Sequence, residues 1–302
     1  MDIDIAPIII FIYKREKKFR NLIDILRYLK PKRLFIFCDG PKNETDRLLI
    51  NKTRNVVGEI DWDVEISYKF SEKNLGAPIA IPTGLDWAFD NVDRCIVLED
   101  DRIPDKTFFH FASYILDKYK NEPKIGYVSG ATPVTLKNIQ GDYFFSKFYL
   151  LPTFGTWKNV WENRIKNYKY VSDKDYEKKI SKLYNNKRFS ERMIKEFKKQ
   201  KYKMKNPNWD FMWRTTCLMN NLLAVYYKNN LTFSDGNDEH ANHKKQFSTI
   251  FDKPPPVKKV DFPIIDPPEV AANPEFDKKV LKKYSLIPFI YRKLLQRLYR
   301  YF

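Results

Sequence analysis

Residues 95–109 read CIVLEDDRIPDKTFF and hold the most informative pattern in the chain. Residues 95–98 form a short apolar run typical of a buried strand, and the acids Glu99, Asp100 and Asp101 follow directly. Open α/β folds bind ligands outside the carboxyl ends of their strands, which favours a functional role for these acids. Their oxygens suit Mg²⁺ or Mn²⁺, an ion that would neutralise both the acids and a substrate diphosphate. A solvated acidic turn is the alternative that these residues leave open.

The flanking sequence alternates between strand and helix patterns. Residues 8–13 are a continuous apolar run, and the charged stretch after them repeats apolar residues at helical spacing. Residues 33–37 and 64–68 repeat the strand pattern, and a helix is expected over 79–89. Strands and helices that alternate on short connections predict an α/β fold with a mostly parallel, Rossmann-like central sheet.

The C-terminal part has a different composition. Prolines at 254–256 and 267–268 predict that residues 253–274 form an extended tail over the body of the protein. Residues 287–298 place apolar side chains on one helical stripe and basic ones elsewhere, which predicts a basic amphipathic helix. Such a helix either lies on an anionic membrane or docks on protein. We therefore expect a domain over 1–252, with halves 1–130 and 131–252, followed by a tail and helix over 253–302.

Charge and cysteine usage limit the class of protein. The chain has 55 Lys and Arg against 38 Asp and Glu, a net charge of +17, which attracts nucleic acid, anionic lipid or phosphorylated small molecules. Its three cysteines are widely spaced and predict neither a disulfide framework nor a zinc cluster. With no secretory signal and no apolar run of bilayer length, we expect a cytoplasmic protein, with the basic helix allowing peripheral contact with the inner face of the membrane.

Residues 95–109 also resemble the strand, acidic triplet and following segment of GT-A glycosyltransferases. They are especially similar to the N-acetylglucosaminyltransferase that begins complex N-glycans and to bacterial sugar transferases. The resemblance implies a GT-A fold and transfer of a hexosyl or N-acetylhexosaminyl group from a nucleotide sugar to a hydroxyl of a glycan or lipid-linked acceptor, in polysaccharide or glycolipid biosynthesis. It implies that Asp101 binds Mn²⁺ or Mg²⁺, that Asp100 and Glu99 contact the donor, and that residues 1–130 form the nucleotide-sugar half and 131–252 the acceptor half.

The resemblance implies further donor contacts before the acidic triplet. The first strand and its loop are expected to hold the nucleotide, the acid after the second strand to face the base, and a later loop to close over the nucleotide. The residues concerned are Ile12, Tyr13 and Arg15, then Asp39, then Lys73, Asn74 and Gly76. A glycine near a helix start permits close approach of phosphate to the backbone, and a lysine adds charge. For residues 39–41 a plain turn is the alternative.

Asp210 is the expected catalytic base. An inverting transferase needs a base to take the proton from the acceptor hydroxyl as that hydroxyl attacks the anomeric carbon. Residues 208–213 read NWDFMW, and the related enzymes place their base in a similar Trp-Asp context at a helix start. A helix cap is the alternative role for Asp210.

Aromatic residues mark the expected acceptor site. Residues 154–157, with Trp161, resemble a Gly-Trp-Ala-Thr-Trp element of bacterial relatives, although here Phe154 precedes the glycine and the first Trp is missing. Aromatic rings stack on sugar faces, and core packing is the alternative. The acceptor-binding residues expected on this basis are Gly155, Thr156, Trp157 and Trp209.

His243 is the expected second metal ligand. The Ala-Asn-His step at 241–243 resembles an Ala-Thr-His motif of bacterial relatives, and imidazole is a suitable ligand beside carboxylates. An exposed pair of histidines without a ligand, His240 with His243, is the alternative.

Two other functions compete with glycosyl transfer. A nucleotidyltransferase also uses α/β architecture, carboxylates and a metal, but it would normally carry a Gly-rich phosphate loop after the first strand, and residues 13–16 contain no glycine. A basic nucleic-acid-binding protein fits the net charge, but the lysines are spread without a recognisable binding module. We therefore expect no nucleic-acid partner.

Overall fold

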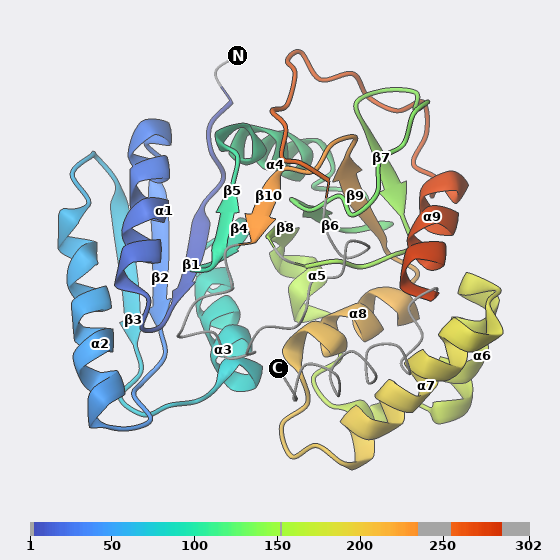
Figure 1. The fold of residues 1–302 in the computed structure, drawn as a ribbon, viewed down its shortest axis with the longest axis horizontal. Helices are drawn as coiled ribbons and strands as arrows, with labels where there is room; N and C mark the ends of the chain where they lie inside the picture. Colours follow the sequence, from blue (N-terminus) through green and yellow to red (C-terminus); the bar gives the residue numbers. More distant parts are fainter. Residues whose placement is uncertain (1–2, 152, 235–254, 286–302) are drawn as a thin grey trace, which may run out of the picture.

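The computed structural model describes residues 3–151, 153–234 and 255–285 (Figure 1). The strands of the central sheet are β1 (Ile8–Ile12), β2 (Arg33–Cys38), β3 (Glu65–Phe70), β4 (Arg94–Glu99), β6 (Ile125–Ser129), β7 (Tyr143–Ser146), β8 (Phe154–Trp157) and β9 (Leu223–Tyr227). A separate two-stranded sheet joins β5 (Arg102–Pro104) to β10 (Thr232–Ser234). The helices are α1 (Glu16–Leu29), α2 (Glu44–Asn55), α3 (Ala77–Phe89), α4 (Lys106–Lys118), α5 (Lys158–Glu162), α6 (Asp173–Tyr184), α7 (Lys187–Tyr202), α8 (Trp209–Met219) and α9 (Pro274–Ser285), with 3-10 turns at Val56–Glu59 and Tyr168–Tyr170.

The central sheet has eight strands in the order β3-β2-β1-β4-β8-β6-β9-β7. Strands β1 to β4 pair in parallel, as do β6 and β9. Strand β8 pairs antiparallel with both β4 and β6, and β7 pairs antiparallel with β9. The prediction of an α/β fold with a mostly parallel sheet is therefore confirmed.

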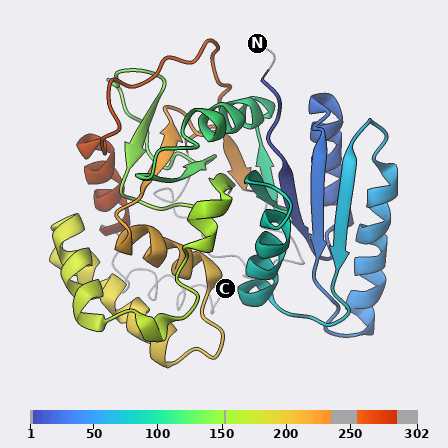
Figure 2. The ribbon, with the colours of Figure 1, turned by 180° about the vertical axis from the view of Figure 1, so that it is seen from behind.

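The central strands are buried on both faces, which explains their continuous apolar sequences. In β1 the side chains of Ile8 and Ile10 join one core, and those of Ile9 and Phe11 join the other. Apolar residues of α1, α2 and α4 complete the first core, and those of α3 and α6 to α9 complete the second. Figure 2 shows the same layers from behind.

The predicted halves share this single sheet. Strand β6, which precedes residue 130, lies between β8 and β9, which follow it. The predicted boundaries at 130 and 252 stay a prediction.

Residues 255–273 pass over the body of the protein as an extended segment. Backbone bridges join Asn230 to Val257 and Phe145 to Ala272. The chain then forms α9, which the sequence did not predict and whose Phe276 and Val280 are fully buried. The predicted helix over 287–298 lies outside the described residues.

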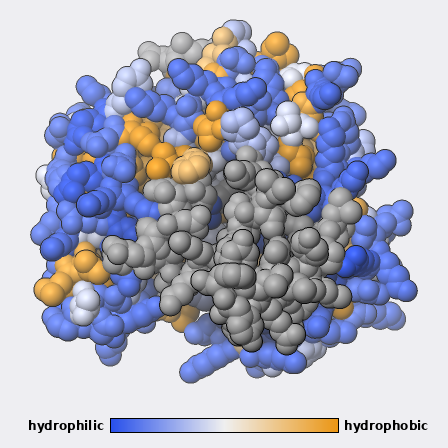
Figure 3. Space-filling model, viewed as in Figure 1, coloured by the Kyte–Doolittle hydropathy of each residue, from blue (hydrophilic) through white to orange (hydrophobic). Residues whose placement is uncertain are grey.

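The surface drawn in Figure 3 is mostly hydrophilic. Within the described ranges, no helix combines the length and apolar character needed to cross a bilayer. Cys38, Cys95 and Cys217 are all buried and unpaired.

Asp266 fixes the extended segment and provides a test of its contribution to stability. Its carboxylate accepts hydrogen bonds from Tyr114 Oη, Tyr143 Oη and Lys118 Nζ, each at 2.7 Å. Burial raises the pKa of Asp266, but these three donors outweigh it and hold the pKa below its ordinary value. We expect Asp266→Asn to lower the free energy of unfolding by about 1 kcal/mol at neutral pH, measured by urea denaturation.

The pH dependence of this loss follows from the lowered pKa. The stabilisation by Asp266 is present above the unfolded-state pKa of about 3.9 and is lost as the pH falls through the folded-state value. The difference between Asp266→Asn and the unaltered protein should therefore shrink in acid. Glu269→Gln, which removes a charge from an exposed position on the same segment, is the control. Equal stability of the two variants at neutral pH would contradict this account.

Candidate active site

The candidate site lies at the carboxyl ends of β1 and β4. From β1 the sheet continues through β2 to β3 on one side, while β4 lies on the other, so the strand order reverses between β1 and β4. Phe11 of β1 is opposite Glu99 of β4, and the backbone N–H of Asp100 still donates to Phe11 O at 3.1 Å. Crevices at such reversal points are the usual ligand sites of open α/β sheets.

Asp100 holds the loop after β1. Arg15 Nη1 donates to Asp100 Oδ1 at 2.6 Å, and Tyr13 N donates to Asp100 Oδ2 at 3.3 Å. Burial raises the pKa of Asp100 to about 6 against the opposing effect of Arg15. Both oxygens of Asp100 therefore have partners within the protein.

Asp101 is less completely paired. Arg15 Nη1 lies 3.5 Å from Asp101 Oδ2 and Arg102 Nε lies 3.4 Å from Asp101 Oδ1, yet this second oxygen is buried and accepts no hydrogen bond. Among residues 3–151, 153–234 and 255–285 no group of three or more His, Cys, Asp or Glu side chains is arranged to hold a metal ion. Mg²⁺ is often bound by one or two carboxylates together with substrate phosphates, and Asp101 fits that kind of site.

Glu99 adds to the negative charge at this edge of the sheet. Burial raises its pKa to about 7, and the charges of Asp101, Asp100 and Asp210 raise it further, against the lowering effect of Arg102. Asp210, whose charge is the smallest of these influences, lies in the first turn of α8. A bound cation would relieve this concentration of like charge.

Asp39, at the end of β2, organises the loop before α3. Its Oδ1 accepts from Gly40 N and Leu75 N at 2.8 Å, and its Oδ2 accepts from Gly76 N at 2.9 Å and from Asn74 Nδ2 at 3.1 Å. A Cβ at Gly40 would lie 2.4 Å from the carbonyl carbon of Lys73, so the loop sits directly against the end of β2. Asp39 thus positions the expected nucleotide loop, with its oxygens turned toward backbone donors.

The other residues that were expected to bind the nucleotide-sugar donor lie in or near this loop and the loop after β1. Tyr13 Oη accepts from Asn74 Nδ2 at 3.3 Å and donates to Asp46 Oδ2 at 2.8 Å. Gly76 has a φ of 73°, a left-handed conformation that suits glycine, and it precedes α3. Lys73 is exposed, whereas Ile12 is buried in the core.

Asp46 and Lys14 were missed by the sequence analysis. Lys14 Nζ pairs with the buried Asp46 carboxylate at 2.9 Å, next to the Tyr13 bond. Burial, then the hydrogen bond to Asp46, raises the pKa of Tyr13. Asp46 lies three residues after Asn43, the cap of α2, a position that normally indicates only helix capping.

Asp210 lies in the first turn of α8, which begins at Trp209, and Asn208 is the cap residue. Arg214 Nη2 donates to Asp210 Oδ2 at 2.5 Å, while the side chain stays 36 % exposed. The neighbouring Trp209 stacks against Phe154 and lines a cavity of ≈ 300 Å³ together with Trp161 and Trp213.

The other expected acceptor residues are in the core. Gly155, Thr156 and Trp157 form β8 and are buried. Thr156 Oγ1 donates to Gly126 O at 2.7 Å, and Trp157 Nε1 donates to Leu116 O at 2.9 Å. The structure thus gives these three residues a packing role, and among the expected acceptor residues only Trp209 lies beside Asp210.

His243 and His240 lie outside the described residues. The preceding strand, β10, pairs antiparallel with β5, and Ser234 is opposite Arg102. The chain therefore leaves β10 beside the residue that follows Asp101.

Comparisons with known proteins give little further guidance. No protein-family model matches the chain, and no curated protein matches its sequence. A solved structure of UDP-glucose pyrophosphorylase complexed with UDP-glucose aligns with a TM-score of 0.37 and 9 % identity, over 74 % of this chain and 90 % of that one.

The role of Asp39 is open to a direct test. In Asp39→Asn the new amide nitrogen would face a backbone donor, so we expect the amides of Leu75 and Gly76 to exchange hydrogen at least about tenfold faster, measured by NMR. Asp63→Asn, at an exposed position before β3, should leave both rates unchanged. Unchanged protection in Asp39→Asn would refute the positioning role.

Proposed function

We propose that this protein is a metal-dependent, inverting glycosyltransferase of the GT-A type that uses a nucleotide-sugar donor. The observation that carries the proposal is Asp101 Oδ1, a buried carboxylate oxygen without a hydrogen bond at the β1–β4 reversal point. Mn²⁺ or Mg²⁺ held by Asp101 would stabilise the negative charge of the departing nucleoside diphosphate.

The donor would lie between the β1 loop and the loop before α3. The Asp39 carboxylate takes the N–H groups of Leu75 and Gly76, so that a diphosphate would be attracted by the positive end of the α3 dipole and by the exposed Lys73. Arg15 is close enough to both Asp100 and Asp101 to hold their carboxylates in place before the donor binds.

The acceptor would approach along α8. Asp210 takes the proton from the acceptor hydroxyl, and its ion pair with Arg214 orients the carboxylate. The ring of Trp209 next to it offers a surface for a sugar. A glycan or lipid-linked acceptor, and His243 as an additional ligand of the metal, belong to this proposal.

Binding of the donor tests the metal site. We expect one nucleotide sugar or nucleoside diphosphate from a panel to raise the melting temperature only when Mn²⁺ is present, because ligands of the native state stabilise it. Asp101→Ala should abolish this Mn²⁺-dependent shift, and Asp93→Ala, on the exposed turn before β4, should retain it. A full shift in Asp101→Ala would rule out the metal role of Asp101.

Turnover tests the base. We expect Asp210→Asn to lower kcat at least about 100-fold, since loss of a general base typically removes that much rate, with donor binding unchanged. Asp90→Asn, at the exposed end of α3, is the control. A near-native kcat in Asp210→Asn would exclude Asp210 as the base.

A further inference from the structure

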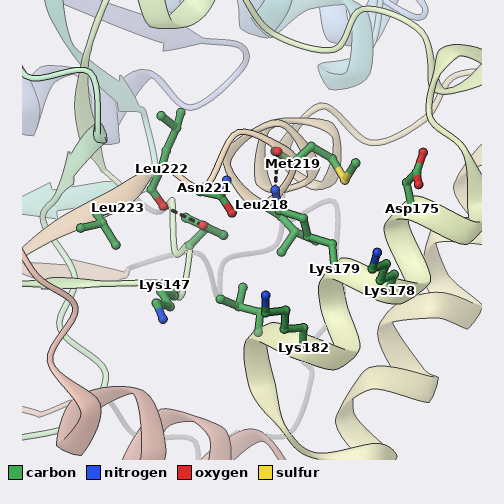
Figure 4. Close-up of a pocket in the computed structure, with 12 residues that line it drawn as sticks. Lys147, Asp175, Lys178, Lys179, Lys182, Leu218, Met219, Asn221, Leu222 and Leu223 are labelled. Carbon is green, nitrogen blue, oxygen red and sulfur yellow. Dashed lines mark hydrogen bonds between the residues drawn. The ribbon is translucent and has the colours of Figure 1, made fainter.

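A second cavity lies at the opposite edge of the sheet from the candidate active site. It has a volume of ≈ 730 Å³ and is bounded by the loop after β7, by α6, by the carboxyl end of α8 and by the start of β9 (Figure 4). Because β9 runs in the same direction as β1 and β4, its first residues lie at the edge away from Asp101. The cavity is therefore separate from the proposed donor site.

The cavity is strongly basic. Its lining includes Lys178, Lys179 and Lys182 from α6 and Lys147 from the loop after β7, with Asp175 as its one acid. Figure 4 shows the three α6 lysines extending beside the end of α8. Four cationic side chains against one carboxylate leave an excess of positive charge around one space.

Lys179 already has a role in the fold. Its Nζ donates to Met219 O at 2.8 Å, at the carboxyl end of α8, where a cation satisfies an otherwise unpaired carbonyl. Burial, and then the charge of Lys182, lowers the pKa of Lys179.

The other three lysines of the cavity, Lys147, Lys178 and Lys182, have no such role in the fold. Within the described ranges, the ammonium groups of these three lysines have no ion pair or hydrogen bond, and all three residues are exposed. Lys178 and Lys182 are four residues apart on α6, a spacing at which like charges repel and destabilise a helix. An anion between them would remove this repulsion.

The wall behind the lysines is apolar. Leu183, Leu218 and Leu222 line it, and Tyr149 packs there with its Oη donating to Leu222 O at 2.8 Å. A volume of this size with an apolar wall and a few charged groups is typical of a small-molecule site.

We propose that this cavity binds a phosphate-bearing ligand. The phosphate lies among Lys178, Lys182 and Lys147, and the apolar part of the ligand packs against the leucines. A phosphate group carries up to two negative charges and several acceptor oxygens, which matches several flexible ammonium groups better than a single carboxylate does. A soluble phosphorylated molecule and a phospholipid head group share this chemistry.

Two probes of the full-length protein distinguish these sources. The first is inorganic pyrophosphate, titrated calorimetrically with EDTA present so that divalent metal at Asp101 plays no part. The second is co-sedimentation with vesicles of phosphatidylcholine mixed with phosphatidylglycerol, compared with phosphatidylcholine alone. We expect Lys178→Gln/Lys182→Gln to weaken binding at least about tenfold, because two charge-assisted contacts are removed.

The matched control is Lys174→Gln/Lys195→Gln, which removes two exposed lysines of α6 and α7 outside the cavity. Binding of pyrophosphate that only the cavity variant loses supports a soluble ligand, and binding of anionic vesicles alone with the same dependence supports a lipid head group. Absence of binding to both probes, or equal loss in the two double variants, overturns the proposal. Asp101→Ala should leave the affinity of the cavity for both probes unchanged. This result would keep the test of the cavity independent of the test of the proposed active site.

Discussion

The guanidinium of Arg15 between Asp100 and Asp101 is the contact on which the candidate site depends. Glu99 ends a strand that is buried on both faces, Asp100 and Asp101 follow it, and burial is the main cause that raises the pKa values of Glu99 and Asp100. Arg15 Nη1 contacts Asp100 at 2.6 Å but lies 3.5 Å from Asp101, whose other oxygen has Arg102 Nε at 3.4 Å and accepts no hydrogen bond. This inequality leaves Asp101 as the acid able to accept another cation.

The same edge of the sheet is fixed by a second carboxylate. The Asp39 carboxylate accepts hydrogen bonds from the N–H of Gly40, its neighbour in sequence, and from those of Leu75 and Gly76. These bonds join the end of β2 to the start of α3. Tyr13 and Asn74 connect this loop to the loop after β1. The proposed donor site is therefore built from three strand ends whose loops are hydrogen-bonded to one another before any ligand arrives.

The sequence predicted what depends on local pattern. The continuous apolar runs of β1, β2 and β4 indicated buried strands, and the acids at the end of β4 indicated the edge of the sheet at which the ligand site is proposed. The sequence did not predict the long-range pairing of strands. No local sequence pattern indicates that β8 lies antiparallel between β4 and β6. For that reason Gly155, Thr156 and Trp157 were expected to bind the acceptor, with core packing as the alternative, and pairing on both sides of β8 buries them.

The sequence also did not predict the contacts between side chains that are far apart along the chain. Asp46 is a helix-cap position by sequence and a partner of Tyr13 and Lys14 in the fold, because α2 returns beside the β1 loop. Asp39 was expected to face a base, whereas its four hydrogen bonds come from the chain itself. The lysines of α6 belong to no recognisable binding module in the sequence, and only the fold brings α8 and β9 beside them around a cavity.

The bond broken in the proposed reaction is the most direct test of the central claim. The reaction contains the stabilising nucleotide sugar, Mn²⁺, pyrophosphate and a panel of hydroxyl acceptors, and phosphorus NMR recorded after EDTA has chelated the paramagnetic Mn²⁺ identifies the phosphorylated product. Glycosyl transfer by the Asp101 site releases a nucleoside diphosphate, because the bond from the anomeric carbon to the phosphate oxygen is broken. Release of a sugar 1-phosphate, with the nucleotide passed to pyrophosphate, would show a nucleotidyltransferase and contradict the account.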